Sequence, residues 1–206
     1  QLISGQVADG EADVVGLRAP DRPLLRVAAL GRSIRFGDDF RAFAEIRRVV
    51  VAFRPDIVHT HTGKAGVLGR IVAITSRVPI TVHTFHGHTL HSYFKRPSAQ
   101  ILRLIESRLA NRTTSLVAVG AKVRDDLLEA GIGRVDQYSV IPPGVDLGSL
   151  PDQVSARIAL GLPPDRPVVL FVGRLTAVKR PDRLIDAMAS VLQRLPEALL
   201  VIAGEG

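Results

Sequence analysis

Apolar residues along the chain follow two alternating patterns. Short runs of apolar and β-branched residues, typical of strands buried within a sheet, are followed by longer segments in which apolar residues recur every three or four positions, typical of helices packed on that sheet. The clearest succession is a strand pattern at 168–172, a helical pattern that begins at Pro181, and a second strand pattern at 198–203. Together these segments predict a βαβ unit with its loops at the carboxyl ends of the strands.

The same alternation runs through the chain before Pro142. It predicts a parallel sheet covered by helices on both faces. We expect strands at 1–5, 12–17, 24–30, 56–60, 79–85, 114–119 and 138–141, and helices at 39–53, 63–76, 95–111, 121–130 and 154–160.

Turn-forming residues cluster after 141, and a new alternation begins beyond Gly148. A domain boundary is therefore expected near Gly148. Residues 1–148 would form one Rossmann-like domain, and residues 149–206 a linker and the beginning of a second domain. The predicted fold class is α/β, with two Rossmann-like domains of which the second is incomplete.

The helix expected at 39–53 combines an apolar stripe with basic residues on its other faces. Packing on a sheet is the more frequent use of such a stripe, and we favour it over binding to a membrane surface. The stripe consists of Phe40, Phe43, Ile46, Val49, Val50 and Phe53, and the basic residues are Arg41, Arg47 and Arg48.

Composition narrows the range of partners. The 206 residues are 46% hydrophobic and include no cysteine, which excludes disulfides and thiolate metal sites. No apolar run reaches the eighteen or so residues that a membrane span needs, and the first residues lack the features of a signal peptide. We therefore expect a cytoplasmic protein, at the inner face of the membrane if its basic helices bind lipid.

The formal net charge of +7 favours anionic partners, such as nucleotide diphosphates or acidic lipid surfaces. Nucleic acid is a further anionic partner that this positive charge would favour. However, the chain has no tryptophan and two tyrosines, so platforms for base stacking are scarce, and no nucleic-acid-binding motif is present. We expect no nucleic-acid partner.

Two cations lie between the strand 168–172 and the helix that follows it. Gly173 ends the strand, and Arg174 and Lys179 occupy the connecting loop. Backbone N–H groups, the positive end of the helix dipole and two fixed cations would all favour a bound anion there. The alternative is that both side chains are solvated loop charges.

All histidines of the chain lie between His59 and His91, and no Asp or Glu occurs from Ile57 to Ile105. This segment therefore excludes a two-carboxylate glycosidase centre. The pairs His59/His61 and His86/His88 could in principle bind a metal, because their spacing places two side chains on one face of a strand. Metal-bound imidazoles usually have carboxylate or carbonyl partners, and no acidic residue is close in sequence. We expect no metal site.

His86 follows the strand 79–85 and precedes Gly87. Ligands of open α/β sheets bind at the carboxyl ends of strands, and glycine permits close approach of a backbone, so we expect His86 to contact a substrate hydroxyl or a reacting oxygen. His59 and His83, inside strands, are expected to be structural. His61, His88 and His91 fit either role, and Gly63-Lys64 at a helix start would form a second electropositive corner.

Five segments in order, spread over about two-thirds of the chain, resemble the retaining glycosyltransferases of family 4, which have the two-domain GT-B fold. A sixth, LLVIAGEG, matches in part. The five segments are PDIVHTHTGKAGVLGR (55–70), TVHTFHGHTLHSYF (81–94), LVAVGAKVRDDL (116–127), VIPPGVDL (140–147) and VVLFVGRLTAVKRPDRLIDA (168–187).

The resemblance implies an acceptor-binding first domain and a second domain that binds a nucleotide-diphosphate sugar. The sugar would pass to a hydroxyl of a sugar or lipid-linked acceptor with retention of anomeric configuration, in polysaccharide or glycolipid synthesis. The leaving phosphate would help to take the acceptor proton, so neither an enzymatic nucleophile nor a metal or other cofactor is expected.

The resemblance also implies roles for individual residues. Arg174 and Lys179 would hold the donor diphosphate as the glycosidic bond breaks, and His86 would lie near the transferred sugar and the acceptor. The implied donor-binding residues are Gly173, Arg174, Lys179 and Gly204, and the implied acceptor-side residues are His61, Lys64, His86, Gly87 and His88.

The chain departs from the family pattern at several places. Gly120 stands where the family often has serine, and Pro143 where asparagine is usual. The family's first strand and glycine-rich loop do not precede Gln1, and its acidic donor-binding pair would lie beyond Gly206. We therefore expect a sequence truncated at both ends, with little turnover by these residues alone. Two alternatives stay open: a nucleotide-sugar epimerase of similar architecture and a non-catalytic basic binding module.

Overall fold

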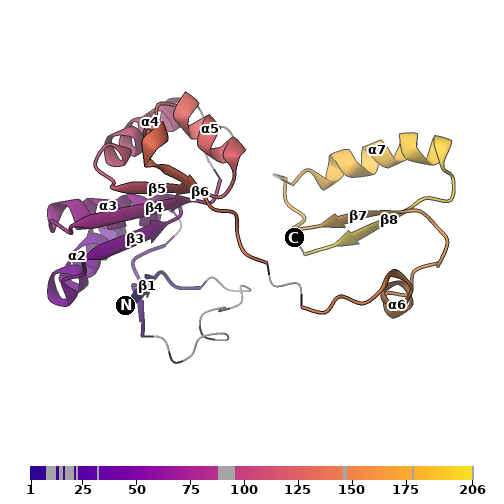
Figure 1. Ribbon diagram of the computed structural model, residues 1–206, viewed down its shortest axis with the longest axis horizontal. Coiled ribbons are helices and arrows are strands. Elements are labelled where there is room, and N and C mark those ends of the chain that lie inside the picture. The colour runs from indigo at the N-terminus through magenta and orange to yellow at the C-terminus, as the bar shows by residue number, and fades with distance from the viewer. Residues whose placement is uncertain are drawn as a thin grey trace. The chain divides into compact units, whose positions relative to one another are not determined.

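The computed structural model describes residues 1–7, 13, 16, 21, 23–31, 33–87, 96–145, 148–177 and 179–205, with residues 96–99 described by their backbone alone. The chain divides into two compact units, Gln1–Gly144 and Val145–Gly206. Figure 1 shows both units, and each is described by itself below.

The main sheet of the first unit has four parallel strands in the order β3-β4-β5-β6. The strands are β3 (Ile57–His61), β4 (Ile80–Phe85), β5 (Ser115–Ala118) and β6 (Tyr138–Val140). The helices α3 (Gly63–Thr75), α4 (Arg96–Ala110) and α5 (Ala121–Glu129) connect them, with a short 3-10 turn, η1 (Val135–Gln137), before β6. The predicted alternation of parallel strands and helices is confirmed here.

A separate parallel pair opens the chain: β1 (Leu2–Ser4) and β2 (Leu24–Arg26). The strand expected at 24–30 stops early because the chain turns after Arg26, where Leu30 N–H donates to the Val27 carbonyl at 3.0 Å. The strand expected at 12–17 falls mostly outside the described residues. Helix α2 (Phe36–Phe53) packs beside β1, β2 and α3 in a core of Val27, Ala42, Ile46, Val50 and Val72.

Helix α2 confirms the preference for packing against the core, but the predicted apolar stripe is too wide. Phe40 and Phe53 are 72% and 58% exposed. Ala42, Ile46 and Val50 recur every four residues and form the buried line of the helix, and the two phenylalanines lie off that line. In the described part of the chain, no helix is both long and apolar enough to cross a lipid bilayer.

The second unit contains α6 (Gln153–Ala159), β7 (Val168–Val172), α7 (Pro181–Arg194) and β8 (Leu199–Ala203). Strands β7 and β8 are parallel and in register from Val168 opposite Leu199 to Val172 opposite Ala203, which confirms the βαβ unit. The expectation that β7 is covered on both faces is wrong: Leu170 is 61% exposed and Val172 73%. Successive side chains along a strand alternate between the two faces of the sheet, so Leu170 and Val172 lie on the same face. Among the described residues, nothing covers that face.

Candidate functional site

The four histidines that the structure describes gather where β3 and β4 end. His59 and His61 lie on β3, His83 lies on β4, and His86 follows β4 directly. The Nδ1 atom of His61 lies 3.0 Å from Nε2 of His86. The rings of His59 and His61 are stacked with their centres 4.3 Å apart. Two residues predicted from the sequence, His61 and His86, are thus within hydrogen-bonding distance, while His88 falls outside the described residues.

His83 lies inside the fold. It is 1% exposed, and its Nδ1 lies 2.8 Å from the hydroxyl of Thr60 on the neighbouring strand. His59 is also held to the next strand, through a 2.8 Å hydrogen bond between its Nε2 and the Thr84 hydroxyl. The predicted structural role of His83 is therefore confirmed, and His59 is anchored although its surface is open to solvent.

Burial lowers the pKa of three of these histidines, His59, His61 and His83, and so favours their uncharged form. It lowers the pKa of His83 to about 2, with the nearby positive charge of Arg70 adding to the effect. Burial also lowers the pKa of His59 and His61, and the neighbouring histidines reinforce both shifts. At the surface of the cluster, His59 and His61 therefore offer neutral imidazole nitrogens, which exchange hydrogen bonds with hydroxyl groups.

The backbone is strained immediately after β3. Thr62 has φ 65° and ψ 174°, a conformation that β-branched residues rarely adopt. Strain of this kind tends to occur at functional sites, and it redirects the chain between His61 and helix α3. The strain at Thr62 is not predictable from the sequence, because no local pattern marks a threonine for positive φ. Gly87, shortly after β4, has φ 125°, a backbone conformation that glycine adopts more readily than other residues.

Lys64 lies on the first turn of α3, but its charge is already paired. Its ammonium contacts the Asp39 carboxylate of α2 and donates to the Ser33 carbonyl at 2.6 Å, and its side chain is 15% exposed. The expected electropositive corner is therefore neutralised. Asp39 is distant in sequence, so only the packing of α2 against α3 brings the two charges together.

A buried ion pair lies behind the histidine cluster and joins α3 to α4. The Arg70 side chain is fully buried, with Nη2 2.5 Å from Oε2 of Glu106, whose side chain is 7% exposed. Arg70 Nε also donates to the Gly66 carbonyl at 3.0 Å, and its guanidinium carbon lies 5.9 Å from the centre of the Phe85 ring. The acidic residue that the local sequence lacks is thus supplied by Glu106, but it binds arginine rather than histidine.

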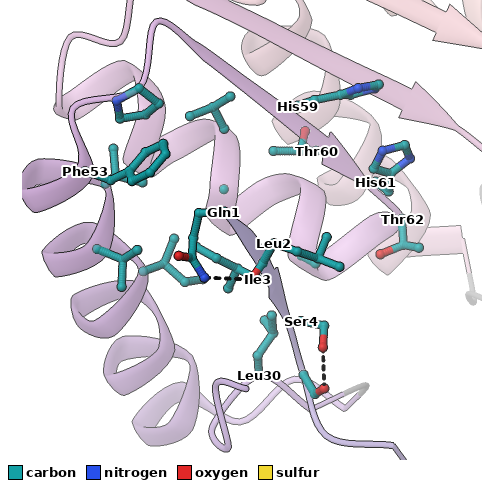
Figure 2. Close-up of a pocket in the computed structure, with 18 of the residues that line it drawn as sticks. Gln1, Leu2, Ile3, Ser4, Leu30, Phe53, His59, Thr60, His61 and Thr62 are labelled. Carbon is teal, nitrogen blue, oxygen red and sulfur yellow. Dashed lines mark hydrogen bonds between the residues drawn. The ribbon is translucent and has the colours of Figure 1, made fainter. Parts of the chain in front are cut away.

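A cavity of about 510 Å³ adjoins the cluster. Figure 2 shows Gln1 and strand β1 on one side of it, and the end of β3 with the following Thr62 on the other. Apolar side chains of α2, among them Ile46, Val50 and Phe53, line much of the rest. The cavity meets the cluster at His59 and His61 and does not include His86, so it borders the candidate site without containing it.

In the second unit, two predicted glycines meet where β7 and β8 end. A Cβ atom on Gly204 would lie 1.9 Å from the carbonyl oxygen of Gly173, so the backbones touch in a way that only glycine permits. The Gly173 N–H donates to the backbone carbonyl of Ala203 at 3.0 Å, and the Leu175 N–H donates to the backbone carbonyl of Glu205 at 2.9 Å. These bonds fix the start of the loop that leads to α7.

Arg174 and Lys179 lie exposed on that loop. Among the described residues, no hydrogen bond or ion pair involves either side chain. The next cation differs, because Arg180 Nη2 lies 2.7 Å from the Asp182 carboxylate. The loop therefore carries two available positive charges beside the N-terminus of α7, an arrangement suited to an anion. Within the described ranges, no group of three or more His, Asp or Glu is placed to hold a metal ion.

A sequence model described as Glycosyltransferase Family 4 matches residues 3–149, well over half of the chain. The chain belongs to glycosyltransferase family 4. A second model, described as Glycosyl transferases group 1, matches residues 152–206. Both histidine strands thus fall in the first matched region of this family 4 chain, and the Arg174 loop falls in the second.

Named relatives of this family 4 chain are glycosyltransferases. A UDP-Gal:α-D-GlcNAc-diphosphoundecaprenol α-1,3-galactosyltransferase of Escherichia coli is 30% identical over 87% of this chain and 48% of its own length. A D-inositol 3-phosphate glycosyltransferase of Segniliparus rotundus is 34% identical over 75% of this chain and 36% of its own. The chain thus spans about half or less of the length of these relatives.

The structure of Anabaena Alr3699/HepE in complex with UDP and glucose covers 99% of this chain with a TM-score of 0.73 and 24% identity. This chain covers 53% of that one. The likeness confirms the predicted GT-B type of α/β fold for this family 4 chain, with a second domain represented in part.

Proposed function

We propose that the protein is a glycosyltransferase that moves a sugar from a nucleotide-diphosphate sugar to a hydroxyl of a sugar or lipid-linked acceptor, in glycolipid or polysaccharide synthesis. The observation that carries this proposal is the pair of available cations at Arg174 and Lys179, on a loop set by the contact of Gly173 with Gly204, in a chain of family 4. We assign the acceptor to the domain 1–148 and the donor to the domain that begins after it.

Arg174 and Lys179 would bind the donor diphosphate. As the bond between the anomeric carbon and the phosphate oxygen breaks, negative charge develops on that oxygen, and fixed cations stabilise it. The acceptor oxygen forms the new bond to the anomeric carbon on the same face, and its proton passes to the leaving phosphate. This course retains the configuration and requires neither an enzymatic nucleophile nor a metal.

On the acceptor side, His86 would contact a hydroxyl near the transferred sugar, with Gly87 allowing close approach. His61 and His88 belong to the same proposed surface. Lys64 has its charge paired with Asp39, so we assign it an indirect role, holding the start of α3 and the strained Thr62 in place.

The donor site is tested by neutralising each cation. We expect Arg174→Ala and Lys179→Ala each to raise the barrier to transfer by about 2–4 kcal/mol, roughly 30- to 1000-fold in rate, because a partner of the developing charge is lost. Turnover of UDP-glucose and UDP-galactose by the full-length protein, and its binding of UDP, are the measurements. Arg180→Ala is the matched control, since its charge is already paired with Asp182. Unchanged turnover in both variants would remove the donor assignment.

Product analysis in the same assay separates the proposal from its nearest rival. A glycosyltransferase yields a glycosylated acceptor and nucleotide diphosphate, and it depends on added acceptor. A nucleotide-sugar epimerase needs no acceptor and yields a new nucleotide sugar, so formation of that product would favour the epimerase.

We further propose peripheral contact with an anionic membrane at the inner face. Three apolar side chains near the start of α2 are open to solvent: Ile34 at 70%, Phe36 at 90% and Phe40 at 72%. The exposed Arg47 and Arg48 lie further along the same helix. Exposed aromatic and basic residues together favour binding at a lipid surface, which co-sedimentation with anionic vesicles tests.

A further inference from the structure

His86 stands on the loop after β4, where an exposed side chain would ordinarily have free choice of rotamer. Its ring nevertheless contacts the ring of His61, at 3.0 Å between ring nitrogens and 5.3 Å between ring centres. His61 is the last residue of β3, in register with Thr84 of β4. A residue on a rigid strand thus holds the ring of a residue on a loop.

His61 is itself supported from behind. Its ring stacks on His59 at 4.3 Å, and His59 is hydrogen-bonded to the Thr84 hydroxyl at 2.8 Å. The succession therefore begins at Thr84 on β4, passes through His59 and His61 on β3, and ends at His86 on the loop after β4. Such support is what keeps a reacting group in one geometry.

The contact also determines which nitrogen of His86 carries the proton. Two neutral imidazoles share a hydrogen bond when one nitrogen donates N–H and the other accepts with its lone pair. Donation from His86 Nε2 to His61 Nδ1 leaves both rings protonated at Nε2, the tautomer that neutral histidine favours in water. The reverse direction would require both rings to be protonated at Nδ1. Donation from His86 is therefore preferred.

We propose that His61 is a positioning residue that fixes the ring and the tautomer of His86, so that Nδ1 of His86 faces substrate as a hydrogen-bond acceptor. Among the described residues, no hydrogen bond involves this Nδ1. An acceptor nitrogen selects a group that can donate, so the substrate atom at His86 is a hydroxyl rather than a carbonyl oxygen. That last step rests on the proposed transfer function, whereas the contact between the two rings does not.

The lowered pKa of His61 supports the same direction of donation. Protonated His61 would have no lone pair at Nδ1 and could not accept from His86. Burial and the neighbouring His59 and His86 lower the pKa of His61, so this lone pair is available at neutral pH.

NMR of the ¹⁵N-labelled chain tests the contact directly. Slightly above neutral pH we expect a through-hydrogen-bond coupling between the Nε2–H of His86 and Nδ1 of His61, with Nδ1 of His86 unprotonated. Protonation of His86 at Nδ1, or absence of the coupling, would overturn the proposal. This measurement uses the wild-type chain, so it does not depend on the folding of any variant.

Two substitutions of His61 test the positioning role. His61→Asn places an amide oxygen near the position of Nδ1 and retains an acceptor, whereas His61→Phe keeps a ring and has none. In the full-length protein, with UDP-glucose or UDP-galactose as donor, we expect His61→Phe to lower kcat about 10- to 100-fold with little change in donor KM, and His61→Asn to recover most of the loss.

The outcomes separate the two proposals. Equal kcat for His61→Phe and wild type would refute the positioning role while the transferase proposal stands. If the full-length wild-type protein transfers no sugar from any donor tested, the proposed function fails, and the coupling measurement still decides whether His61 fixes the ring of His86.

Discussion

At the scale of single residues, identical side chains in this chain differ sharply in chemistry because of their surroundings. His83 is 1% exposed and bonded to Thr60, whereas His86 lies in the open at the end of the same strand. Arg174 has no ionic partner among the described residues, while Arg180 a few positions on is paired with Asp182. The residue type therefore limits which interactions a side chain can make, and burial and neighbouring groups determine which of them it makes.

His83 makes the stability of the first unit depend on pH. The unfolded imidazole takes up a proton below its ordinary pKa of about 6.5, while burial keeps the folded one neutral down to about 2. The unfolded state thus binds more protons in this window, so stability is complete above pH 6.5 and falls as the pH decreases. We expect a loss of about 2 kcal/mol between pH 7 and pH 5.

Urea unfolding at each pH, followed by the fluorescence of the half-buried Tyr138, measures this dependence. His83→Gln is the control, because a side chain that does not titrate removes the contribution of this site. If wild type and His83→Gln lose stability in parallel as the pH falls, burial of the neutral imidazole is not its source.

At the scale of elements, α3 lies unusually close to the sheet because glycines face it. A Cβ on Gly66 would lie 2.4 Å from the ring of His83, and one on Gly69 would lie 2.7 Å from the Thr60 methyl group. The helix backbone therefore packs directly against the side chains of His83 and Thr60. The Arg70–Glu106 ion pair then ties the same helix to α4.

Gly66→Ala tests this contact. The His83 ring is enclosed and cannot give way, so we expect a loss of about 1–3 kcal/mol from overpacking. Gly63→Ala on the same helix is the matched control, since nothing lies within 4 Å of its added Cβ. The free energy of unfolding in urea is the measurement. A loss at Gly63 equal to that at Gly66 would contradict the proposed close packing.

At the scale of the whole molecule, the two units carry different chemistry. The first holds a four-stranded sheet and the histidine cluster, in which the pKa of His59, His61 and His83 is lowered. The second holds a two-stranded sheet and the loop with two available cations, and its buried side chains include Met188 of α7 and Ala198, just before β8. The proposed division into acceptor and donor binding follows this difference in charge.

The net charge of +7 is a property of the whole chain, and it sets the expected salt dependence of membrane contact. We expect the protein to sediment with vesicles of anionic lipid and not with zwitterionic ones, and to be released as salt screens the attraction. Phe40→Ser should weaken this binding. Ile158→Ser, which changes a side chain of similar exposure in the other unit, should not. Equal sedimentation with both lipid types would overturn the proposal.

The sequence by itself determined the order and type of the main elements from β3 to β8, because buried strands and amphipathic helices leave periodic patterns. It also singled out Arg174, Lys179 and His86, since glycine and proline mark where a strand ends and a helix begins. Its errors include Phe40, Phe53 and β7, because periodicity indicates which residues are apolar but not which of their faces is covered.

Only the tertiary structure decided which distant groups meet. It joined His61 to His86, neutralised Lys64 with Asp39, and buried Glu106 against Arg70. Each of these contacts links residues that are far apart in the sequence. Its strength depends on the distance between the two groups and on how deeply they are buried. A pattern of neighbours along the chain carries no record of either quantity, so the chemistry of the site is fixed by packing.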